Sequence, residues 1–297
     1  MSQALITGVA GFTGKYLAEA LAAHGHRVSG IGIEPRPDSV PLDDYRRADM
    51  LDADALKDAV AALRPDFVFH LAGISHVAHG SADAIYRVNI VASRNLLTAL
   101  AALEIPPQRV LLASTANLYG NQEGVLTEQT PPAPMNDYAV SKLAMEYMAS
   151  LFKSRLPITI VRPFNYTGRG QSPAFLIPKL VQHFKERRPF IELGNTDVVR
   201  DFSDVRDVAD CYVRLAEAEN AGWGPYNFCS GRGLSIGGIL SLLREMTGHT
   251  IEMRINPAFV RQNEVKHLIG SRERLEGAIG TVSPIPFRDT LRWMLDE

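Results

Sequence analysis

A tyrosine and a lysine stand four residues apart in the run Tyr138-Ala139-Val140-Ser141-Lys142. On a helix, side chains at positions i and i+4 share one face, so the lysine ammonium would lie beside the phenol. A neighbouring positive charge stabilises the phenolate and lowers the pKa of a tyrosine from its usual value of about 10. The spacing therefore predicts a tyrosine that acts as a general acid or base near neutral pH.

Two hydroxyl side chains follow a short apolar run in Leu111-Leu112-Ala113-Ser114-Thr115-Ala116-Asn117. The carboxyl ends of the strands in an open α/β sheet are where such sheets bind ligands. A serine or threonine there can donate a hydrogen bond to a substrate carbonyl beside the tyrosine. A hydroxyl at a strand end can equally bond to its own backbone, so for Ser114 and Thr115 both interpretations stay open.

Three glycines, Gly8, Gly11 and Gly14, follow the first apolar run and lead into a predicted helix. In a strand–turn–helix unit, such glycines permit a tight turn, a close approach of backbone to a pyrophosphate, and close packing of helix on strand. The N-terminus of the predicted helix adds unpaired backbone N–H donors and the positive end of the helix dipole. The sequence predicts a dinucleotide site here, with a tight turn that holds no ligand as the alternative.

The end of the second predicted strand bears on the choice between NAD and NADP. An acidic residue there binds the ribose 2′-hydroxyl, whereas an arginine accommodates a 2′-phosphate. Glu34 favours NAD and Arg36 favours NADP, two residues apart. The predicted cofactor is therefore NAD or NADP, with the choice open.

The elements that would position these groups alternate along the first half of the chain. Short apolar runs predict strands and the longer segments between them predict helices. The predicted strands are Ala4–Thr7, Val28–Ile33, Phe67–Leu71, Val110–Ala113 and Ile158–Val161, and the predicted helices cover about 13–24, 53–63, 81–103 (with Asp83 as its N-terminal cap) and 137–155. This order predicts an α/β fold with a doubly wound parallel Rossmann sheet, covered by helices on both faces.

From about residue 164 the alternation loosens, and Gly and Pro become frequent. Isolated helices are predicted at Phe175–Lys185 and Ile236–Met246, whereas a helix over Asp207–Ala218 and a strand over Tyr226–Phe228 can extend the main sheet. We therefore expect a Rossmann domain over residues 1–163, to which about 205–230 return. A smaller α/β C-terminal substrate lobe would comprise residues 164–204 and 231–297.

The composition is typical of a globular protein, with 46% hydrophobic and 22% charged residues among 297. Because 31 Lys and Arg face 33 Asp and Glu, the net charge is −2, which argues against a nucleic-acid partner. No apolar run approaches the roughly 18 residues that cross a bilayer, and the N-terminus lacks the pattern of a signal peptide. We expect a cytoplasmic protein without a membrane partner.

Metal and disulfide chemistry find little support. The two cysteines, Cys211 and Cys229, are too few for a disulfide framework or a zinc knuckle. His76 and His79 have a spacing that could hold a metal, but no carboxylate or cysteine accompanies them. No metal site is predicted.

Together the motifs resemble the extended short-chain dehydrogenase/reductase family of nucleotide-sugar enzymes, over nearly the whole chain. The matching runs are Thr7-Gly8-x-x-Gly11-x-x-Gly14, Ala48-Asp49-Met50, His70-Leu71-Ala72-Gly73, Val88-Asn89-Ile90, Ser114-Thr115-Ala116-Asn117-Leu118-Tyr119-Gly120, Tyr138-x-x-x-Lys142, Arg162-Pro163-Phe164-Asn165 and Arg200-Asp201-Phe202-Ser203-Asp204-Val205. The resemblance implies Thr115, rather than Ser114, together with Tyr138 and Lys142 as the catalytic set.

The same resemblance implies two sets of binding residues. The cofactor would contact Gly8, Gly11, Phe12, Thr13, Gly14, Glu34, Arg36, Asp49, Met50, Leu71, Ala72, Gly73, Asn89, Tyr138, Lys142 and Pro163. The substrate would contact Thr115, Asn117, Asn165, Lys179, Arg200, Arg261 and Glu264. Arginines suit a nucleotide sugar because the guanidinium fork matches phosphate oxygens.

Within the family, the run from Arg162 to Gln171 followed by Phe175-Leu176-Ile177 is similar to the GDP-mannose branch. That similarity implies reduction of the C4 ketone of GDP-4-keto-6-deoxy-D-mannose to GDP-D-rhamnose or its 4-epimer, with hydride from NAD(P)H. An NAD-dependent nucleotide-sugar 4-epimerase and a non-catalytic dinucleotide-binding sensor are the alternatives.

Two positions depart from the family pattern. Asn117 stands where dehydratases carry an acid, and because an amide cannot abstract a carbon-bound proton, dehydration is disfavoured. Gly32 stands where many relatives have their ribose-binding acid, which weakens the assignment of Glu34 to that role.

The predicted helix 137–155 is apolar on more than one side, so it must cover the sheet and a second surface. As in relatives, it would form a homodimer interface together with the helix over 81–103.

Overall fold

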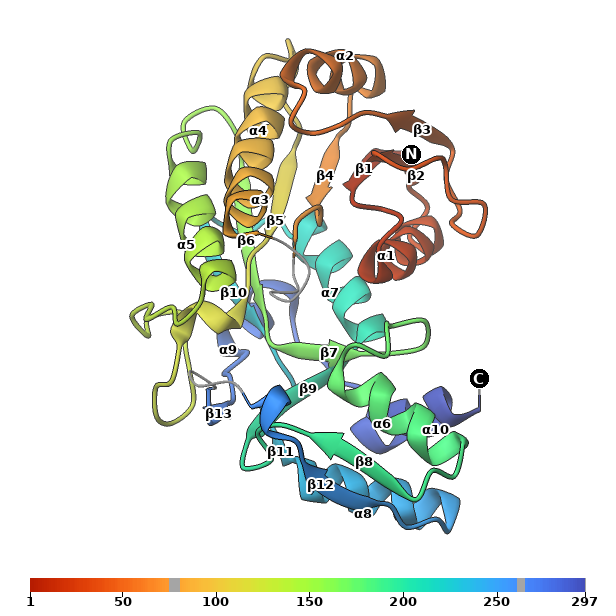
Figure 1. Ribbon diagram of the computed structural model, residues 1–297. Helices are drawn as coiled ribbons and strands as arrows, with labels where there is room; N and C mark the ends of the chain where they lie inside the picture. Colours follow the sequence, from red (N-terminus) through yellow and green to blue (C-terminus); the bar gives the residue numbers. More distant parts are fainter. Residues whose placement is uncertain (75–80, 261–264, 297) are drawn as a thin grey trace.

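Seven parallel strands form the central sheet of the computed structural model, which describes residues 1–74, 81–260 and 265–296. Their order is β10-β6-β5-β4-β1-β2-β3, so the strand order reverses beside β1, as in a doubly wound fold (Figure 1). The strands are Gln3–Thr7 (β1), Arg27–Gly32 (β2), Asp44–Arg47 (β3), Phe67–His70 (β4), Arg109–Ala113 (β5), Ile158–Pro163 (β6) and Gly224–Phe228 (β10). The predicted fold class is confirmed.

Helices cover both faces of this sheet, which is why its strands are apolar almost throughout. One face carries α1 (Phe12–Ala23), α7 (Val205–Glu217) and α9 (Glu273–Ile279), and their buried side chains form one core with the strands. The other face carries α2 (Ala53–Leu63), α4 (Ser93–Ala101) and α5 (Asp137–Ser150) over a second core (Figure 1).

The predicted helix 81–103 is three consecutive segments. They are α3 (Ala82–Tyr86), a π-helical segment η2 (Arg87–Ala92) and α4. The assignment of Asp83 as the cap was wrong: Ser81 is the cap, and its hydroxyl accepts a hydrogen bond from the Ala84 N–H at 3.2 Å. A cap must precede the first helical residue with extended backbone, and Asp83 already lies inside the helix.

Two further boundaries differ from the prediction. Helix α5 ends at Ser150, and turns follow where the helix was expected to reach residue 155. Strand β3 was not predicted, because Asp44-Tyr45-Arg46-Arg47 is a polar edge strand that lacks an apolar run.

The rest of the chain builds smaller sheets beside the carboxyl edge of the main one. The strands are Asn165–Thr167 (β7), Phe190–Leu193 (β8), Val199–Asp204 (β9), Gly233–Ser235 (β11), Glu252–Ile255 (β12) and His267–Leu268 (β13), and the helices are Leu176–Lys185 (α6), Ile236–Thr247 (α8) and Phe287–Leu295 (α10). Two short 3-10 helices are Ala116–Tyr119 (η3) and Pro257–Phe259 (η4). A core of its own lies among α6, α8 and α10.

Strand β10 lies at the edge of the main sheet, next to β6, so the chain returns to the sheet after residue 204. The domain limits 1–163 with about 205–230, and 164–204 with 231–297, stay a prediction. Within the three described ranges, no helix has the length and apolar character needed to cross a membrane.

Candidate active site

The glycine-rich turn lies between β1 and α1, packed against the end of β4. A Cβ on Gly8, whose φ is +73°, would lie 2.8 Å from the Ala72 nitrogen, and one on Gly14 would lie 2.5 Å from the Val9 oxygen. Neither position tolerates a side chain. Glycine at these two positions therefore allows the turn to pack against the segment after β4, and α1 to pack against the turn, more closely than any residue with a side chain would.

The N-terminus of α1 is suited to an anion. Its cap residue is Gly11, which supplies no side-chain hydrogen bond, and its first turn contains no acidic residue. Backbone N–H groups and the positive end of the helix dipole therefore face the turn without a protein carboxylate to neutralise them. This arrangement fits the pyrophosphate of a dinucleotide.

Phe12 and Thr13, in the first turn of α1, contact a residue from a distant part of the chain. The Thr13 hydroxyl shares a 2.8 Å hydrogen bond with the hydroxyl of Tyr166 on β7, and the rings of Phe12 and Tyr166 stack at 6.2 Å. The start of the glycine-rich helix is thus fixed to the segment that follows β6. Sequence reasoning did not single out Tyr166.

Tyr138 and Thr115 come together at the carboxyl edge of the sheet. Tyr138 lies in the first turn of α5, which is capped by Asn136, and Thr115 caps the 3-10 helix η3 after β5. The Thr115 hydroxyl lies close enough to the phenol of Tyr138 to lower its pKa. The Asn117 N–H also donates to the Thr115 hydroxyl at 3.2 Å, so Asn117 lies next to this pair.

Lys142 lies one helical turn after Tyr138 and is buried. Its Nζ donates to the Ala113 carbonyl at 2.8 Å. A Cβ built on Gly73 would be 3.2 Å from this Nζ and 2.9 Å from the Asn89 Oδ1. The ammonium therefore lies between the end of β5, the segment after β4 and Asn89.

The expectation that Lys142 lowers the pKa of Tyr138 was wrong for this structure. Desolvation raises the pKa of Tyr138 to about 12, only partly opposed by the hydrogen bond with Thr115, and the lysine is not among the groups that act on it. Burial also lowers the pKa of Lys142 to about 8, against the attraction of Glu146. At neutral pH Tyr138 is a protonated phenol, able to donate.

Ser114, in contrast to Thr115, forms a hydrogen bond with a buried ion pair. Its hydroxyl donates to the Glu146 Oε1 at 2.5 Å, and Glu146 accepts two bonds from Arg162, at 3.0 and 2.6 Å. Arg162 also donates to the hydroxyl of Tyr119 at 3.0 Å. Of the two hydroxyls that the residues alone left open, Thr115 therefore faces Tyr138. The signal for Glu146 was a carboxylate within a helix that is apolar on more than one side.

A second buried network lies behind the segment that follows β4. The His70 ring shares bonds of 2.7 Å with Thr7 and 2.8 Å with Ser93, and the Ser93 hydroxyl donates to the Asn89 carbonyl at 2.8 Å. Burial lowers the pKa of His70 to about 3, so the ring is neutral. Asn89 accepts from the Ile74 N–H at 2.9 Å, from within the π-helical segment. Such segments are often found at functional sites.

The predicted cofactor residues lie along one edge of the sheet. Leu71, Ala72 and Gly73 follow β4, Pro163 ends β6, and Glu34 and Arg36 are exposed beyond the end of β2. Asp49 is exposed and Met50 buried after β3. Their contacts with a dinucleotide stay a prediction.

The predicted substrate residues lie in the smaller sheets. Asn165 is on β7, which pairs with β9, where the buried Arg200 donates to the Val199 and Lys266 carbonyls at 3.1 and 3.2 Å. Lys179, on α6, donates to the Glu192 carbonyl at 2.7 Å. Arg261 and Glu264, like His76 and His79, lie outside the described residues. No group of side chains suited to a metal ion occurs in the ranges that the structure describes.

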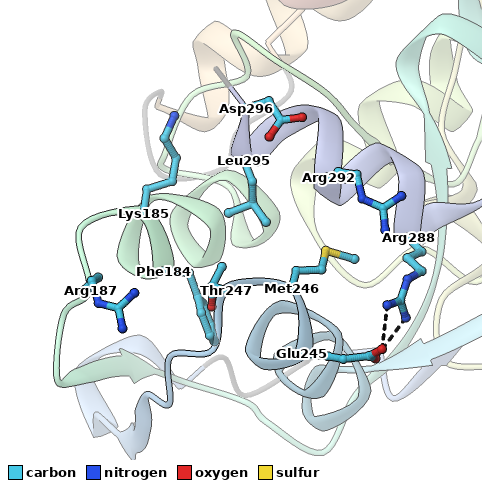
Figure 2. Close-up of a pocket in the computed structure, with 10 residues that line it drawn as sticks. All are labelled: Phe184, Lys185, Arg187, Glu245, Met246, Thr247, Arg288, Arg292, Leu295 and Asp296. Carbon is cyan, nitrogen blue, oxygen red and sulfur yellow. Dashed lines mark hydrogen bonds and ion pairs between the residues drawn. The ribbon is translucent and has the colours of Figure 1, made fainter.

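A separate surface pocket of about 710 Å³ opens between α6, α8 and α10. Figure 2 shows charged side chains around it, among them Lys185, Arg187 and Arg292, and the Arg288–Glu245 pair with bonds of 3.0 and 2.7 Å. None of the predicted catalytic or binding residues lines it. The candidate active site is therefore the strand ends around Tyr138.

Comparisons with known proteins agree with this geometry. The chain matches the model of the NAD dependent epimerase/dehydratase family over residues 4–229. A GDP-6-deoxy-D-talose 4-dehydrogenase from Aggregatibacter actinomycetemcomitans is 35% identical over 93% of this chain and 90% of its own. A GDP-6-deoxy-D-mannose reductase from Pseudomonas aeruginosa is 34% identical over 100% of this chain and 97% of its own.

Solved structures share the fold. A crystal structure from Burkholderia cenocepacia J2315, assigned in general terms to the epimerases, is 50% identical and has a TM-score of 0.92. The match covers 99% of this chain and 97% of that one. Other structures with the fold contain NAD or NADPH.

Proposed function

The chain belongs to the NAD-dependent epimerase/dehydratase family, and from that premise we propose that it reduces the C4 ketone of a nucleotide-linked 4-keto-6-deoxy sugar. The proposed substrate is GDP-4-keto-6-deoxy-D-mannose, and the product is GDP-D-rhamnose or its 4-epimer. The two relatives described above, both named for GDP-6-deoxy sugars, support this choice.

The observation that carries the proposal is the proximity of the Thr115 hydroxyl to the phenol of Tyr138 at the strand ends. When bound, the dinucleotide supplies hydride to C4, and the ketone oxygen then gains negative charge. Tyr138 donates its proton to that oxygen, and its raised pKa keeps the proton in place at neutral pH. Thr115 holds the same oxygen through a hydrogen bond, which strengthens as the charge develops.

Lys142 and the glycine-rich turn position the cofactor in this proposal. The Lys142 ammonium, held by the Ala113 carbonyl, would donate to the nicotinamide ribose beside Gly73. The uncapped start of α1 would bind the pyrophosphate. Asn117 has no acid–base function, which is why dehydration is excluded from the proposal.

The sugar nucleotide would lie between these strand ends and the lobe of residues 164–204 and 231–297. Asn165 and Arg200, on the paired strands β7 and β9, would contact it together with Lys179, Arg261 and Glu264. Arg200 is buried and held by two backbone carbonyls, so its guanidinium group is already oriented. An oriented guanidinium group can bind phosphate oxygens with little loss of side-chain freedom.

The test is to incubate the full chain with GDP-4-keto-6-deoxy-D-mannose and either NADH or NADPH. We expect one mole of reduced cofactor to be oxidised per mole of sugar, with the 6-deoxyhexose product identified by NMR. The epimerase name of the Burkholderia relative favours epimerisation as the second candidate, and 4-epimerisation is the form that acts at the same carbon. Interconversion of 4-epimers without net cofactor consumption would replace the proposal with that candidate. Cofactor binding without turnover would indicate a sensor.

We also propose a homodimer through η2 and α5. Val140, Tyr147 and Leu151 recur on one side of α5 and its C-terminal end, and Tyr147 and Leu151 are 68% and 75% exposed. Val91 of η2 adds a further exposed apolar side chain. An exposed apolar strip of this kind is typical of a protein interface.

Replacing Tyr147 and Leu151 together with glutamate is expected to convert the dimer to a monomer, because the interface would bury four new charges. Sedimentation velocity of both proteins measures the change. The control is Ile255→Glu, an equally exposed apolar position on β12. A wild-type chain that sediments as a monomer at all concentrations would contradict the proposal.

A further inference from the structure

The end of β2 is built from glycines because a neighbouring side chain occupies the space above it. A Cβ on Gly30 would lie 2.6 Å from the Val9 Cγ1 and 3.0 Å from the Tyr45 Cδ2, and a Cβ on Gly32 would lie 2.7 Å from the Tyr45 hydroxyl. The Tyr45 hydroxyl donates to the Glu34 carbonyl at 2.6 Å. The phenol of Tyr45 therefore packs over Gly30 and Gly32, the last part of β2, and its hydrogen bond to Glu34 holds the backbone that follows the strand.

This place is where a Rossmann fold selects its cofactor. An acidic side chain at the end of the second strand binds the 2′-hydroxyl of the adenosine ribose, and a basic one accommodates a 2′-phosphate. In this chain Gly32 supplies no carboxylate, and the nearest atom to any side chain it could carry is the phenol oxygen of Tyr45. Position 32 thus has no acidic side chain, and the Tyr45 phenol occupies the space that such a side chain would need.

The guanidinium group of Arg47 lies beside Gly32 at the end of β2. Strands β2 and β3 pair in parallel with Arg47 opposite Gly32 and Tyr45 opposite Gly30. Because side chains alternate along a strand, Tyr45 and Arg47 share one face of β3, and Arg46 points to the other. The Arg47 Nε donates to the Ile33 carbonyl at 2.8 Å, which holds the side chain over the end of β2.

The arginines at this edge of the sheet differ in their partners. Arg46 pairs with Asp44 at 3.1 Å, whereas Arg47 and Arg36 form no ion pair with any described residue. Arg36 donates to the Leu42 carbonyl. Each backbone contact orients a guanidinium group and leaves other N–H donors of the fork for an anion.

We propose that Tyr45 and Arg47 make this dinucleotide site selective for the 2′-phosphate of NADPH over the 2′-hydroxyl of NADH. Tyr45 excludes the carboxylate that would bind the free ribose, and Arg47, with Arg36, binds the phosphate. The inference rests on the proposed function only in placing a nicotinamide dinucleotide at this site. It is therefore tested by binding, without the sugar.

The experiment measures dissociation constants of the full chain for NADPH and NADH by isothermal titration calorimetry. We expect the wild type to bind NADPH at least 10-fold more tightly than NADH. Arg47→Ala is expected to weaken NADPH binding about 10-fold or more, because it removes charge-assisted hydrogen bonds, while NADH binding changes less than about 2-fold. Arg46→Ala, the adjacent and already paired arginine, is the matched control and should change neither constant.

A second set of variants tests Tyr45. Gly32→Asp alone should weaken both cofactors, because the new side chain meets the phenol oxygen. Gly32→Asp with Tyr45→Phe removes that oxygen, and the next ring atom lies 3.6 Å from the Cβ. The double variant should therefore lose at least 10-fold of the preference for NADPH.

Three results would overturn the inference. They are a wild type that binds NADH as tightly as NADPH, an Arg47→Ala variant that changes neither constant, and a Glu34→Gln variant that weakens NADH binding 10-fold. The last result would assign the ribose 2′-hydroxyl to Glu34. Failure of the sugar reduction would leave these binding constants, and hence the inference, unaffected.

Discussion

Replacing Tyr138 with phenylalanine is expected to lower the rate of ketone reduction by about 10²-fold or more. The change removes the phenol hydroxyl beside Thr115 and keeps the ring in its place. Without that proton donor, the alkoxide that forms at C4 must take its proton from water. Because desolvation holds the pKa of Tyr138 at about 12, the wild-type side chain is protonated over the whole neutral range.

The measurement is the rate of NADPH oxidation at saturating GDP-4-keto-6-deoxy-D-mannose. The matched control is Tyr147→Phe, which removes a hydroxyl from an exposed position on the same helix. Unchanged thermal unfolding and circular dichroism of the Tyr138→Phe variant would show that the effect is chemical. Turnover within about 3-fold of the wild type would reject Tyr138 as the proton donor.

The direction of the pKa shift of Tyr138 could not be predicted from the sequence. The four-residue spacing correctly predicted that Tyr138 and Lys142 share one region of α5 beside the strand ends. The direction of the pKa shift depends on desolvation by residues from other elements, and on the Ala113 carbonyl that binds the lysine ammonium. Neither is encoded in a local pattern.

The same distinction separates the strands that were predicted from the one that was not. The buried strands β1, β4, β5 and β6 can be predicted as short apolar runs, because helices cover both faces of the sheet. Strand β3 is held by pairing with β2 and contains two arginines, so only its partner reveals it. The residues on which the cofactor inference depends, Tyr45 and Arg47, lie on that strand.

Ser114 and Thr115 illustrate the limit in the site itself. As neighbouring hydroxyls at a strand end they cannot be distinguished by the local pattern, although the family resemblance favours Thr115; in the structure their partners differ. Glu146 lies 32 residues away from Ser114 and takes its hydroxyl, whereas Tyr138 meets Thr115. The tertiary structure decides which of the two hydroxyls already has an acceptor, and this supports Thr115 as the one proposed to contact the substrate.

Replacing Glu146 with alanine is expected to reduce the free energy of unfolding by about 3–5 kcal/mol, the largest stability effect anticipated in this chain. Glu146 and Arg162 are both buried, at 7% and 5% exposure, and form two hydrogen bonds with each other. Burial opposes the charge on Arg162, but the bonds and attraction of Glu146 raise its pKa above the usual value, so the guanidinium group stays charged. Without Glu146 that charge would be buried without a partner.

The exposed pair Arg288–Glu245 is the matched control, because it has the same two residue types and is also joined by two hydrogen bonds (Figure 2). Glu245→Ala should cost less than about 1 kcal/mol, since water replaces the lost carboxylate. Urea unfolding of both variants gives the two free energies. A double variant, Glu146→Leu with Arg162→Met, should recover much of the loss, because it removes the unpaired charge as well as the pair. Equal losses in the two single variants would show that burial does not set the strength of this pair, and that the hydrogen bond to Tyr119 suffices to hold Arg162 in place.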